Sequence, residues 1–130
     1  MTDVFAKIVL GHLTGDYLLQ SKAMALNKSK KGWRGFAWCV FHCVTYTAAV
    51  SLFLWTVNPL TISLIFASHF VVDRWSLATV WLKFIRGRDF ASAYLSKDQH
   101  REFDIAFTCL VYTVADNTIH LISLWLIAML

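Results

Sequence analysis

Three histidine–aspartate pairs, each with a spacing of four residues, lie inside three separate apolar stretches of the chain. In chain order the pairs are His12–Asp16, His69–Asp73 and Asp116–His120. Four residues correspond to about one helical turn, so the two members of each pair share one face of a helix. Ionisable groups within membrane-length helices cost on the order of a few kcal/mol each and usually face the interior of a bundle. The pattern therefore predicts helices packed around a shared polar site.

The composition is typical of a membrane protein. Of the 130 residues, 58% are hydrophobic and only 15% are charged, whereas soluble domains average about 25% charged residues. Four apolar runs are long enough for membrane spans of about 20 residues; they cover residues 4–21, 35–57, 60–83 and 103–129. We therefore expect an all-α polytopic membrane protein, in which residues 1–130 form a single four-helix transmembrane bundle. This arrangement leaves no length for a separate soluble catalytic domain.

The connections between the expected spans carry most of the positive charge. Ten of the 12 Lys and Arg residues lie in or beside the first and third connections. The positive-inside rule makes both connections cytoplasmic and places both termini outside, in a multi-pass protein of the bacterial inner membrane. The net charge of +4 is then an orientation signal and an anionic-lipid contact, and we expect no nucleic-acid partner. The Asn58-Pro59 turn predicts antiparallel second and third spans, and the third connection predicts a short interfacial helix near Phe90–Leu95.

The expected spans contain a donor set for a divalent transition metal. The candidate ligands are His12, Asp16, His42, His69, Asp73, Asp116 and His120. Neutral imidazole and ionised carboxylate bind Zn²⁺ at about 2.0–2.2 Å, and the same donors suit Mn or Fe. We expect one or two ions, with zinc favoured. The alternative for each pair is an intramembrane hydrogen bond that only holds helices together.

An estimate of depth indicates which of these groups can meet. With a rise of about 1.5 Å per residue from each cytoplasmic end, Asp16, His42 and Asp73 lie about 9 to 15 Å deep. Asp116 lies at about 20 Å and His120 at about 25 Å. We therefore expect the ligands to meet in one layer of the cytoplasmic half, with His120 as the poorest fit.

Other polar residues indicate how a substrate would be handled. Asp16 and Asp73 are the candidate catalytic residues, and Asp16 is either a ligand or a general base. The candidate substrate-binding residues are Arg74, Lys22, Lys83 and Gln20. The basic ones would attract a phosphate headgroup from the inner leaflet, while Gln20 either lies at the interface or orients a ligand. Because no nucleophilic serine motif is present, a metal-activated water is the more economical nucleophile.

The order of these motifs resembles a family of small bacterial and phage integral membrane proteins that is catalogued as a domain of unknown function. The resemblance is carried by Gly11-His12-Leu13, Gly15-Asp16-Tyr17-Leu18-Leu19-Gln20, Lys28, His42, His69-Phe70-Val71-Val72-Asp73 and Asp116-Asn117-Thr118-Ile119-His120. It covers nearly the whole chain and departs at Asn117, where that family usually has Gln. It implies a four-helix membrane protein without an established activity. A looser similarity to predicted membrane-bound metal-dependent hydrolases implies an enzyme.

Several functions are compatible with these residues. The leading hypothesis is a metal-dependent hydrolase that acts on a lipid or another membrane-soluble ester or phosphoester. A proton or metal-ion transporter would use the same intramembrane groups as a relay. A haem-binding bundle with paired histidines and a non-enzymatic membrane interaction protein are further alternatives. Membrane lipid is the expected partner, and either a homo-oligomer or a partner membrane protein remains open.

Overall fold

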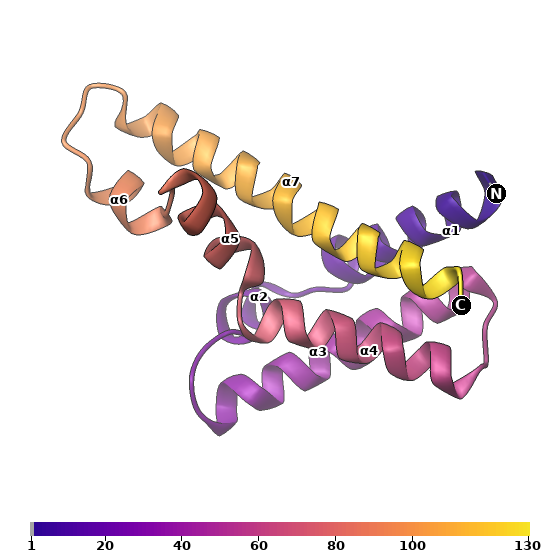
Figure 1. Ribbon diagram of the computed structural model, residues 1–130. Coiled ribbons are helices and arrows are strands. Elements are labelled where there is room, and N and C mark those ends of the chain that lie inside the picture. Colours follow the sequence, from indigo (N-terminus) through magenta and orange to yellow (C-terminus); the bar gives the residue numbers. More distant parts are fainter. Residues whose placement is uncertain (1) are drawn as a thin grey trace. The chain divides into compact units, whose positions relative to one another are not determined.

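The computed structural model describes residues 2–130, and these residues form helices and no strand (Figure 1). The elements are α1 (Thr2–Leu13), the π-helix η1 (Thr14–Leu18), α2 (Lys22–Asn27), α3 (Trp33–Leu54), α4 (Pro59–Arg74), α5 (Leu77–Arg86), α6 (Phe90–Leu95) and α7 (Arg101–Ala128). The all-α prediction is therefore confirmed. The chain divides into two compact units. The first contains the residues up to Trp75 together with 120–130, and the second contains residues 76–119.

Two helices are long and apolar enough to cross a membrane. They are α3, with 22 residues, and α7, with 28 residues. At about 1.5 Å per residue both exceed the hydrocarbon thickness of about 30 Å. They correspond to the expected spans 35–57 and 103–129.

The expected first span, 4–21, is not one continuous α-helix. Regular α-helix ends at Leu13, and Thr14–Leu18 forms a single π-helical turn. A π turn widens the helix locally, changes the direction of the side chains that follow, and is frequent at functional sites. Here the turn carries Gly15 and Asp16, so the break occurs at the first candidate ligand pair.

The expected third span, 60–83, is also interrupted. The helix α4 ends at Arg74, and Ser76 adopts the left-handed conformation with φ 48° and ψ 51°. Such a backbone cannot continue a right-handed helix, so α5 starts afresh at Leu77. The period of apolar residues continues across the break, which is why the sequence pattern predicted a single helix there.

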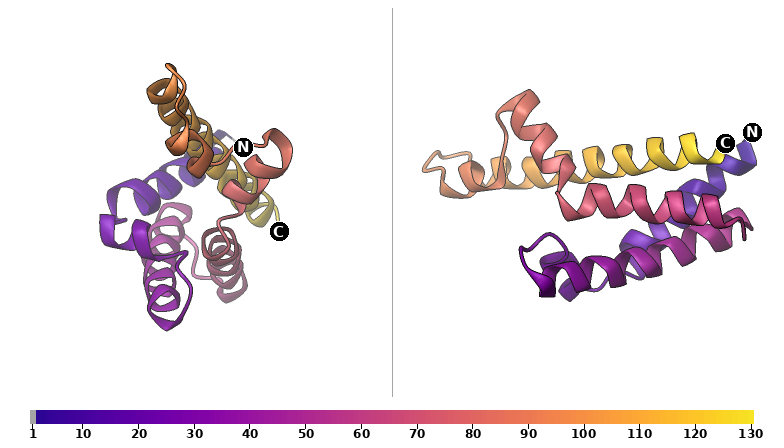
Figure 2. Two further views of the ribbon diagram at one scale, coloured as in Figure 1. Left: turned by 90° about the vertical axis from the view of Figure 1, so that its left-hand side faces the viewer. Right: turned by 60° about the horizontal axis from the view of Figure 1, so that its bottom comes forward.

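The turn between the second and third spans follows the prediction. Oδ1 of Asn58 accepts hydrogen bonds from the backbone N–H groups of Leu60 (2.9 Å) and Thr61 (3.4 Å). Pro59 occupies the first turn, where its missing N–H is not needed. The helices α3 and α4 pack side by side in both views of Figure 2, as expected for antiparallel neighbours. The short helix expected at Phe90–Leu95 is also present, as α6.

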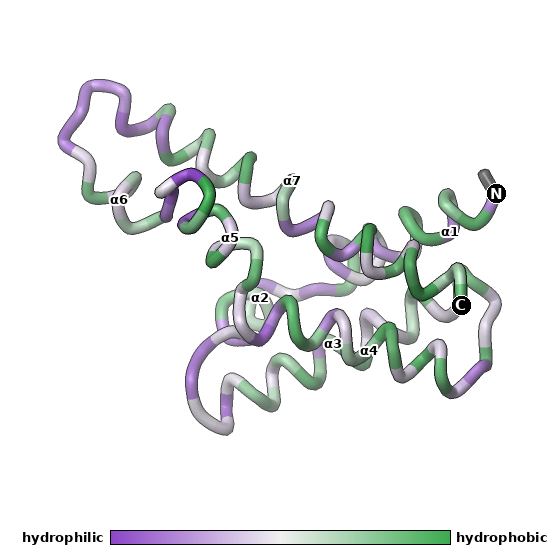
Figure 3. The backbone as a smooth tube through the Cα atoms, viewed as in Figure 1, coloured by the Kyte–Doolittle hydropathy of each residue, from purple (hydrophilic) through white to green (hydrophobic). Residues whose placement is uncertain are grey.

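The first unit is built around contacts of α3. Its apolar core contains Ile8, Tyr46, Val50, Ile65 and Leu124. The helix α1 and the turn η1 approach α3 closely because each has a glycine facing it, Gly11 in α1 and Gly15 in η1. The strongly hydrophilic stretches lie in the connection before α3 and around the α6–α7 connection (Figure 3).

Candidate metal centre

Four histidines from four helices are buried in the first unit. They are His12 of α1, His42 of α3, His69 of α4 and His120 of α7, and each is at most 1% exposed. Asp73 is 4% exposed, one turn after His69 on α4. Buried imidazoles and carboxylates are costly unless they are hydrogen-bonded, paired or metal-bound. Their gathering confirms the expectation that these helices pack around a polar site.

The centre of the cluster consists of two imidazole nitrogens and two carboxylate oxygens. Nε2 of His42 and Nε2 of His69 are 3.0 Å apart. Oδ1 of Asp16 lies 3.1 Å from the first nitrogen and 3.4 Å from the second. Oδ2 of Asp73 lies 3.1 Å and 3.2 Å from the same two atoms. All five separations are close to the distance of about 3.3 Å between neighbouring ligand atoms of a tetrahedral zinc ion.

The two carboxylate oxygens of this set also lack regular hydrogen bonds. Oδ1 of Asp16 and Oδ2 of Asp73 are buried, and neither accepts a hydrogen bond of normal geometry from the described residues, although the ammonium of Lys28 forms an ion pair with Oδ2 of Asp73 at 2.7 Å. Their short contacts with the imidazoles are therefore not directed as hydrogen bonds. Atoms that face a common cation would have this arrangement, so the residues fit a divalent metal.

His120 extends the cluster on the other side of His69. Nδ1 of His69 is 3.1 Å from Nδ1 of His120, and Oδ1 of Asp73 is 3.6 Å from Nε2 of His120. Two three-residue groups with metal-ligand spacing result: Asp16, His42 and His69, and His69, Asp73 and His120. The expectation that His120 would fit poorly is wrong. The depth estimate assumed parallel helices of regular geometry, whereas two of the expected spans are broken.

His12 contacts Asp16 through the carboxylate oxygen that faces away from the centre. Nδ1 of His12 is 3.3 Å from Oδ2 of Asp16 and 3.0 Å from the hydroxyl of Tyr46. An outer residue that fixes the orientation of a ligand is a common partner of metal sites. The two members of the first His–Asp pair therefore have different positions: Asp16 lies at the centre of the cluster, and His12 contacts Asp16 from outside it.

Tyr46 belongs to the site and was not among the residues chosen from the sequence. Its ring stacks on the imidazole of His69, with 3.4 Å between centroids and 13° between planes. Gly15 makes room for this ring, because a Cβ atom there would lie 2.6 Å from Cδ2 of Tyr46. Tyr46 follows His42 by four residues, the same spacing as in the His–Asp pairs. This spacing could have identified Tyr46 as a site residue from the sequence.

Two polar residues from the segment between α1 and α3 reach the cluster. Nε2 of Gln20 lies 2.9 Å from Nε2 of His42, consistent with the expectation that Gln20 orients a ligand. Nζ of Lys28 lies 2.7 Å from Oδ2 of Asp73, and its side chain is 14% exposed. The sequence suggested no site role for Lys28, because it was one of several basic residues in a loop that we expected to be cytoplasmic.

The other candidate residues are Arg74, Lys22, Lys83 and Asp116. The guanidinium of Arg74 donates to the backbone carbonyl of Lys30 at 2.9 Å and so ties α4 to the loop before α3. Lys22 is exposed on α2. Lys83 pairs with Asp89 at 3.5 Å. Lys83 and Asp116 belong to the second unit.

Comparison with known proteins places this constellation in a family without a described activity. No curated protein and no solved structure matches the chain significantly. A family-wide sequence profile matches residues 4–130, which include every residue of the His/Asp cluster. The expected resemblance to an uncharacterised family is thereby confirmed. The chain belongs to the family described as "Protein of unknown function (DUF3307)".

Proposed function

We propose that this chain is a multi-pass protein of the bacterial cytoplasmic membrane that binds a divalent transition metal, with zinc favoured, inside its helix bundle. We infer that the protein is a hydrolase of a lipid or another membrane-soluble ester or phosphoester, in which the bound metal would activate the attacking water. The observation that carries this proposal is the convergence of donor atoms on two imidazole nitrogens, which lie 3.0 Å apart and each within 3.1–3.4 Å of two carboxylate oxygens.

The membrane setting is supported by the outer faces of the helices. Phe41 and Leu52 on α3 and Leu60 on α4 are between 54% and 67% exposed. Apolar side chains in such numbers on the surface suit contact with lipid. Irregular backbone such as η1 is tolerated at membrane depth where it faces protein or lines a cavity, and here it carries Asp16 into the cluster. Four passes, with the basic connections in the cytoplasm and both termini outside, complete the proposal.

The chemistry follows from the donor set. A divalent metal held by His42, His69 and the two aspartates would supply hydroxide near neutral pH and polarise the scissile group. Asp73 faces both three-residue groups, with one oxygen directed to each, so a second ion has ligands available. In a one-metal site Asp16 is free to act as the general base instead. The ammonium of Lys28 supports binding of a phosphate oxygen.

A transport function is the second candidate, and one observation favours it. Gln20, His42, His69 and His120 form a continuous series of side-chain nitrogen contacts of 2.9, 3.0 and 3.1 Å. A chain of imidazoles can relay protons. Flux of protons or metal ions into sealed vesicles without any hydrolysis would replace the hydrolase proposal with this one.

A haem site agrees less well with the geometry. Two axial nitrogens on opposite sides of an iron ion would be about 4 Å apart, since each metal–nitrogen bond is about 2 Å. Nε2 of His42 and Nε2 of His69 are closer than that, at 3.0 Å. A purified sample without visible absorption would remove the haem alternative.

Elemental analysis of the purified protein tests the metal site. We expect at least one transition-metal ion per chain in the wild type and a large loss in Asp73→Asn and Asp73→Ala. The matched control is Asp3→Ala, because Asp3 is a well-exposed aspartate whose ion pair is with Lys7 along α1. Full metal content in both Asp73 variants would contradict the site. Hydrolysis of phospholipid by wild-type proteoliposomes, and none by Asp73→Asn, tests the activity.

A further inference from the structure

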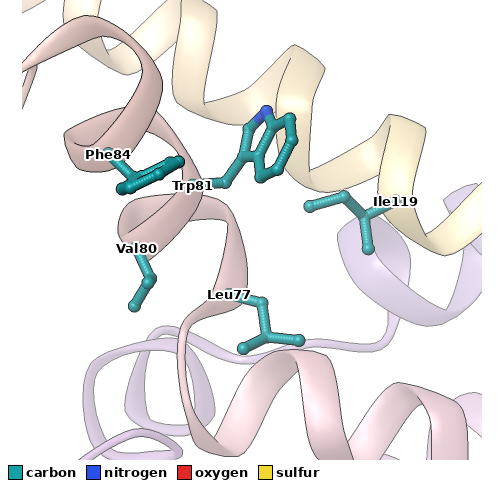
Figure 4. Close-up of a pocket in the computed structure, with 5 residues that line it drawn as sticks. All are labelled: Leu77, Val80, Trp81, Phe84 and Ile119. Carbon is teal, nitrogen blue, oxygen red and sulfur yellow. The ribbon is translucent and has the colours of Figure 1, made fainter.

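The second unit, residues 76–119, carries two pockets that differ in chemistry. The first has a volume of about 440 Å³ and is lined by Leu77, Val80, Trp81 and Phe84 of α5 and by Ile119 of α7. In Figure 4 the side chains of Trp81 and Ile119 point toward each other across the space between the two helices. The lining is almost entirely apolar, so this pocket suits a hydrocarbon chain.

The second pocket is polar and charged. It has a volume of about 290 Å³, and its lining includes Arg86, Arg88, Asp104 and Thr108. The guanidinium of Arg88 is held over the ring of Phe107, with its carbon 4.5 Å from the ring centroid. The carboxylate of Asp104 makes no ion pair within residues 2–130. The pocket therefore presents two cations and two carboxylates, those of Asp89 and Asp104, within one small volume.

The two pockets lie along the same side of α7. Asp104 and Thr108 are one turn apart, and Thr108 and Ile119 are separated by eleven residues, which is about three turns. All three positions therefore share one helix face. Along the helix axis, Thr108 and Ile119 are about 16 Å apart. This distance is about half of the hydrocarbon thickness of a bilayer, the depth occupied by the chains of one leaflet.

The helix α5 has the character of an interfacial helix. It is only ten residues long, or about 15 Å, too short to cross the bilayer alone. Trp81 and Phe84 are 56% and 83% exposed on its apolar side, while Lys83 and Arg86 lie in its last turn. An amphipathic helix of this kind lies at the boundary between headgroups and acyl chains.

We propose that this unit binds one glycerophospholipid with a zwitterionic phosphoethanolamine headgroup. Arg86 and Arg88 bind the phosphate, Asp104 binds the ammonium, and an acyl chain occupies the apolar pocket beside Trp81. Asp89 does not compete for the ammonium, because it caps α6 through the backbone N–H of Ser92 at 2.7 Å and pairs with Lys83. This inference uses only residues 76–119 and does not rest on the proposed metal centre.

Native mass spectrometry of the full-length chain in lipid-free detergent tests the proposal. Three probes are compared: phosphatidylethanolamine, phosphatidylglycerol and soluble phosphoethanolamine. We expect one phosphatidylethanolamine per chain, bound more tightly than the anionic lipid, and much weaker binding of the soluble headgroup. Arg88→Gln should weaken binding of both lipids by about tenfold, the size expected for a lost charge-assisted hydrogen bond.

The isosteric variant Asp104→Asn tests the headgroup assignment. We expect this variant to bind phosphatidylethanolamine more weakly and phosphatidylglycerol with unchanged affinity, so the preference for phosphatidylethanolamine is lost. Lys97→Gln is the control, because Lys97 is exposed and lines neither pocket. A photoreactive acyl chain on phosphatidylethanolamine should label residues of α5 or the Ile119 end of α7.

Three results would overturn the proposal: labelling confined to other helices, equal binding of both lipids to the wild type, or unchanged affinities in Arg88→Gln and Asp104→Asn. Metal content measured on the same variants separates this site from the metal centre. It should stay at the wild-type value in all three variants, so a failure of one proposal is distinguishable from a failure of the other.

Discussion

Substitution of Gly15 by alanine tests how the π-helical turn supports the cluster. A Cβ at this position would lie 2.6 Å from Cδ2 and 3.2 Å from Cα of Tyr46. The ring has little freedom to retreat, because it is stacked on His69 with 3.4 Å between centroids. The new atom therefore displaces either the backbone of α3 or the imidazole beyond the ring.

The magnitude follows from two opposing contributions. Overpacking of a filled interior costs typically about 1–3 kcal/mol, and contact with both a backbone atom and a stacked ring favours the upper value. Alanine in place of glycine in a helix recovers about 1 kcal/mol. The expected net destabilisation is about 2 kcal/mol, which corresponds to about a 30-fold larger unfolding constant. Because Tyr46 contacts both His69 and His12, metal affinity should fall by about tenfold or more.

The assay combines thermal unfolding in mild detergent with metal titration, and Gly11→Ala is the matched comparison. A Cβ at Gly11 would lie 3.0 Å from Cα of Val50, which is also on α3; this contact is less tight than that of Gly15, and Val50, unlike Tyr46, does not stack on a histidine ring. Gly11→Ala should lower stability and leave metal affinity unchanged. Wild-type stability and affinity in Gly15→Ala would refute the reasoning, as would equal losses of metal affinity in both variants.

Three further predictions follow from single contacts. Lys28→Met should raise metal affinity by about tenfold or more, because the ammonium of Lys28 lies 2.7 Å from Oδ2 of Asp73 and repels a metal cation bound to the same carboxylate. Competition titration with a chromophoric chelator measures the affinity, and weaker metal binding in the variant would contradict this prediction. Tyr46→Phe removes the hydroxyl that lies 3.0 Å from Nδ1 of His12 but keeps the apolar packing of the ring. Thermal unfolding should show a loss of about 1 kcal/mol of stability, and a loss as large as that of Tyr46→Ala would contradict this prediction. The backbone N–H of Ser92 lowers the pKa of Asp89 from its ordinary value of 3.8, so the contribution of this cap to α6 is complete above that value and is lost as pH falls through the lowered one. The protection factors of the α6 amides, which are corrected for the intrinsic pH dependence of exchange, should therefore be smaller at acidic pH in the wild type and already at neutral pH in Asp89→Ala. Equal protection factors at both pH values in the wild type would count against the cap.

The sequence predicted the participants of the site better than the helices that carry them. Spacing of four residues identified His12, Asp16, His69 and Asp73, because one helical turn brings such residues to one face whether or not the helix is continuous. The interruptions at Leu13 and Ser76 were not predictable from hydropathy, since apolar residues resume within a few positions of both. They depend on tertiary contacts, such as the packing of Gly15 against Tyr46.

The residues that sequence reasoning missed depend on contacts between distant segments. Lys28 reaches Asp73 only because the loop before α3 folds back on α4, where Arg74 holds the carbonyl of Lys30. The depth of His120 was misjudged for a related reason. A uniform rise per residue from each cytoplasmic end cannot represent helices that start at different heights or break on the way.

X-ray absorption of the purified, metal-loaded protein tests the central claim most directly. If the metal centre is as proposed, the edge will identify a divalent transition metal, and the fine structure will contain imidazole scattering from about two histidines with nitrogen and oxygen neighbours at about 2.0–2.1 Å. The double variant His42→Ala/His69→Ala should lose both the imidazole signal and most of the metal. A metal-free wild-type protein, or a metal whose neighbours include no imidazole, would contradict the assignment of this histidine–aspartate cluster as a metal centre.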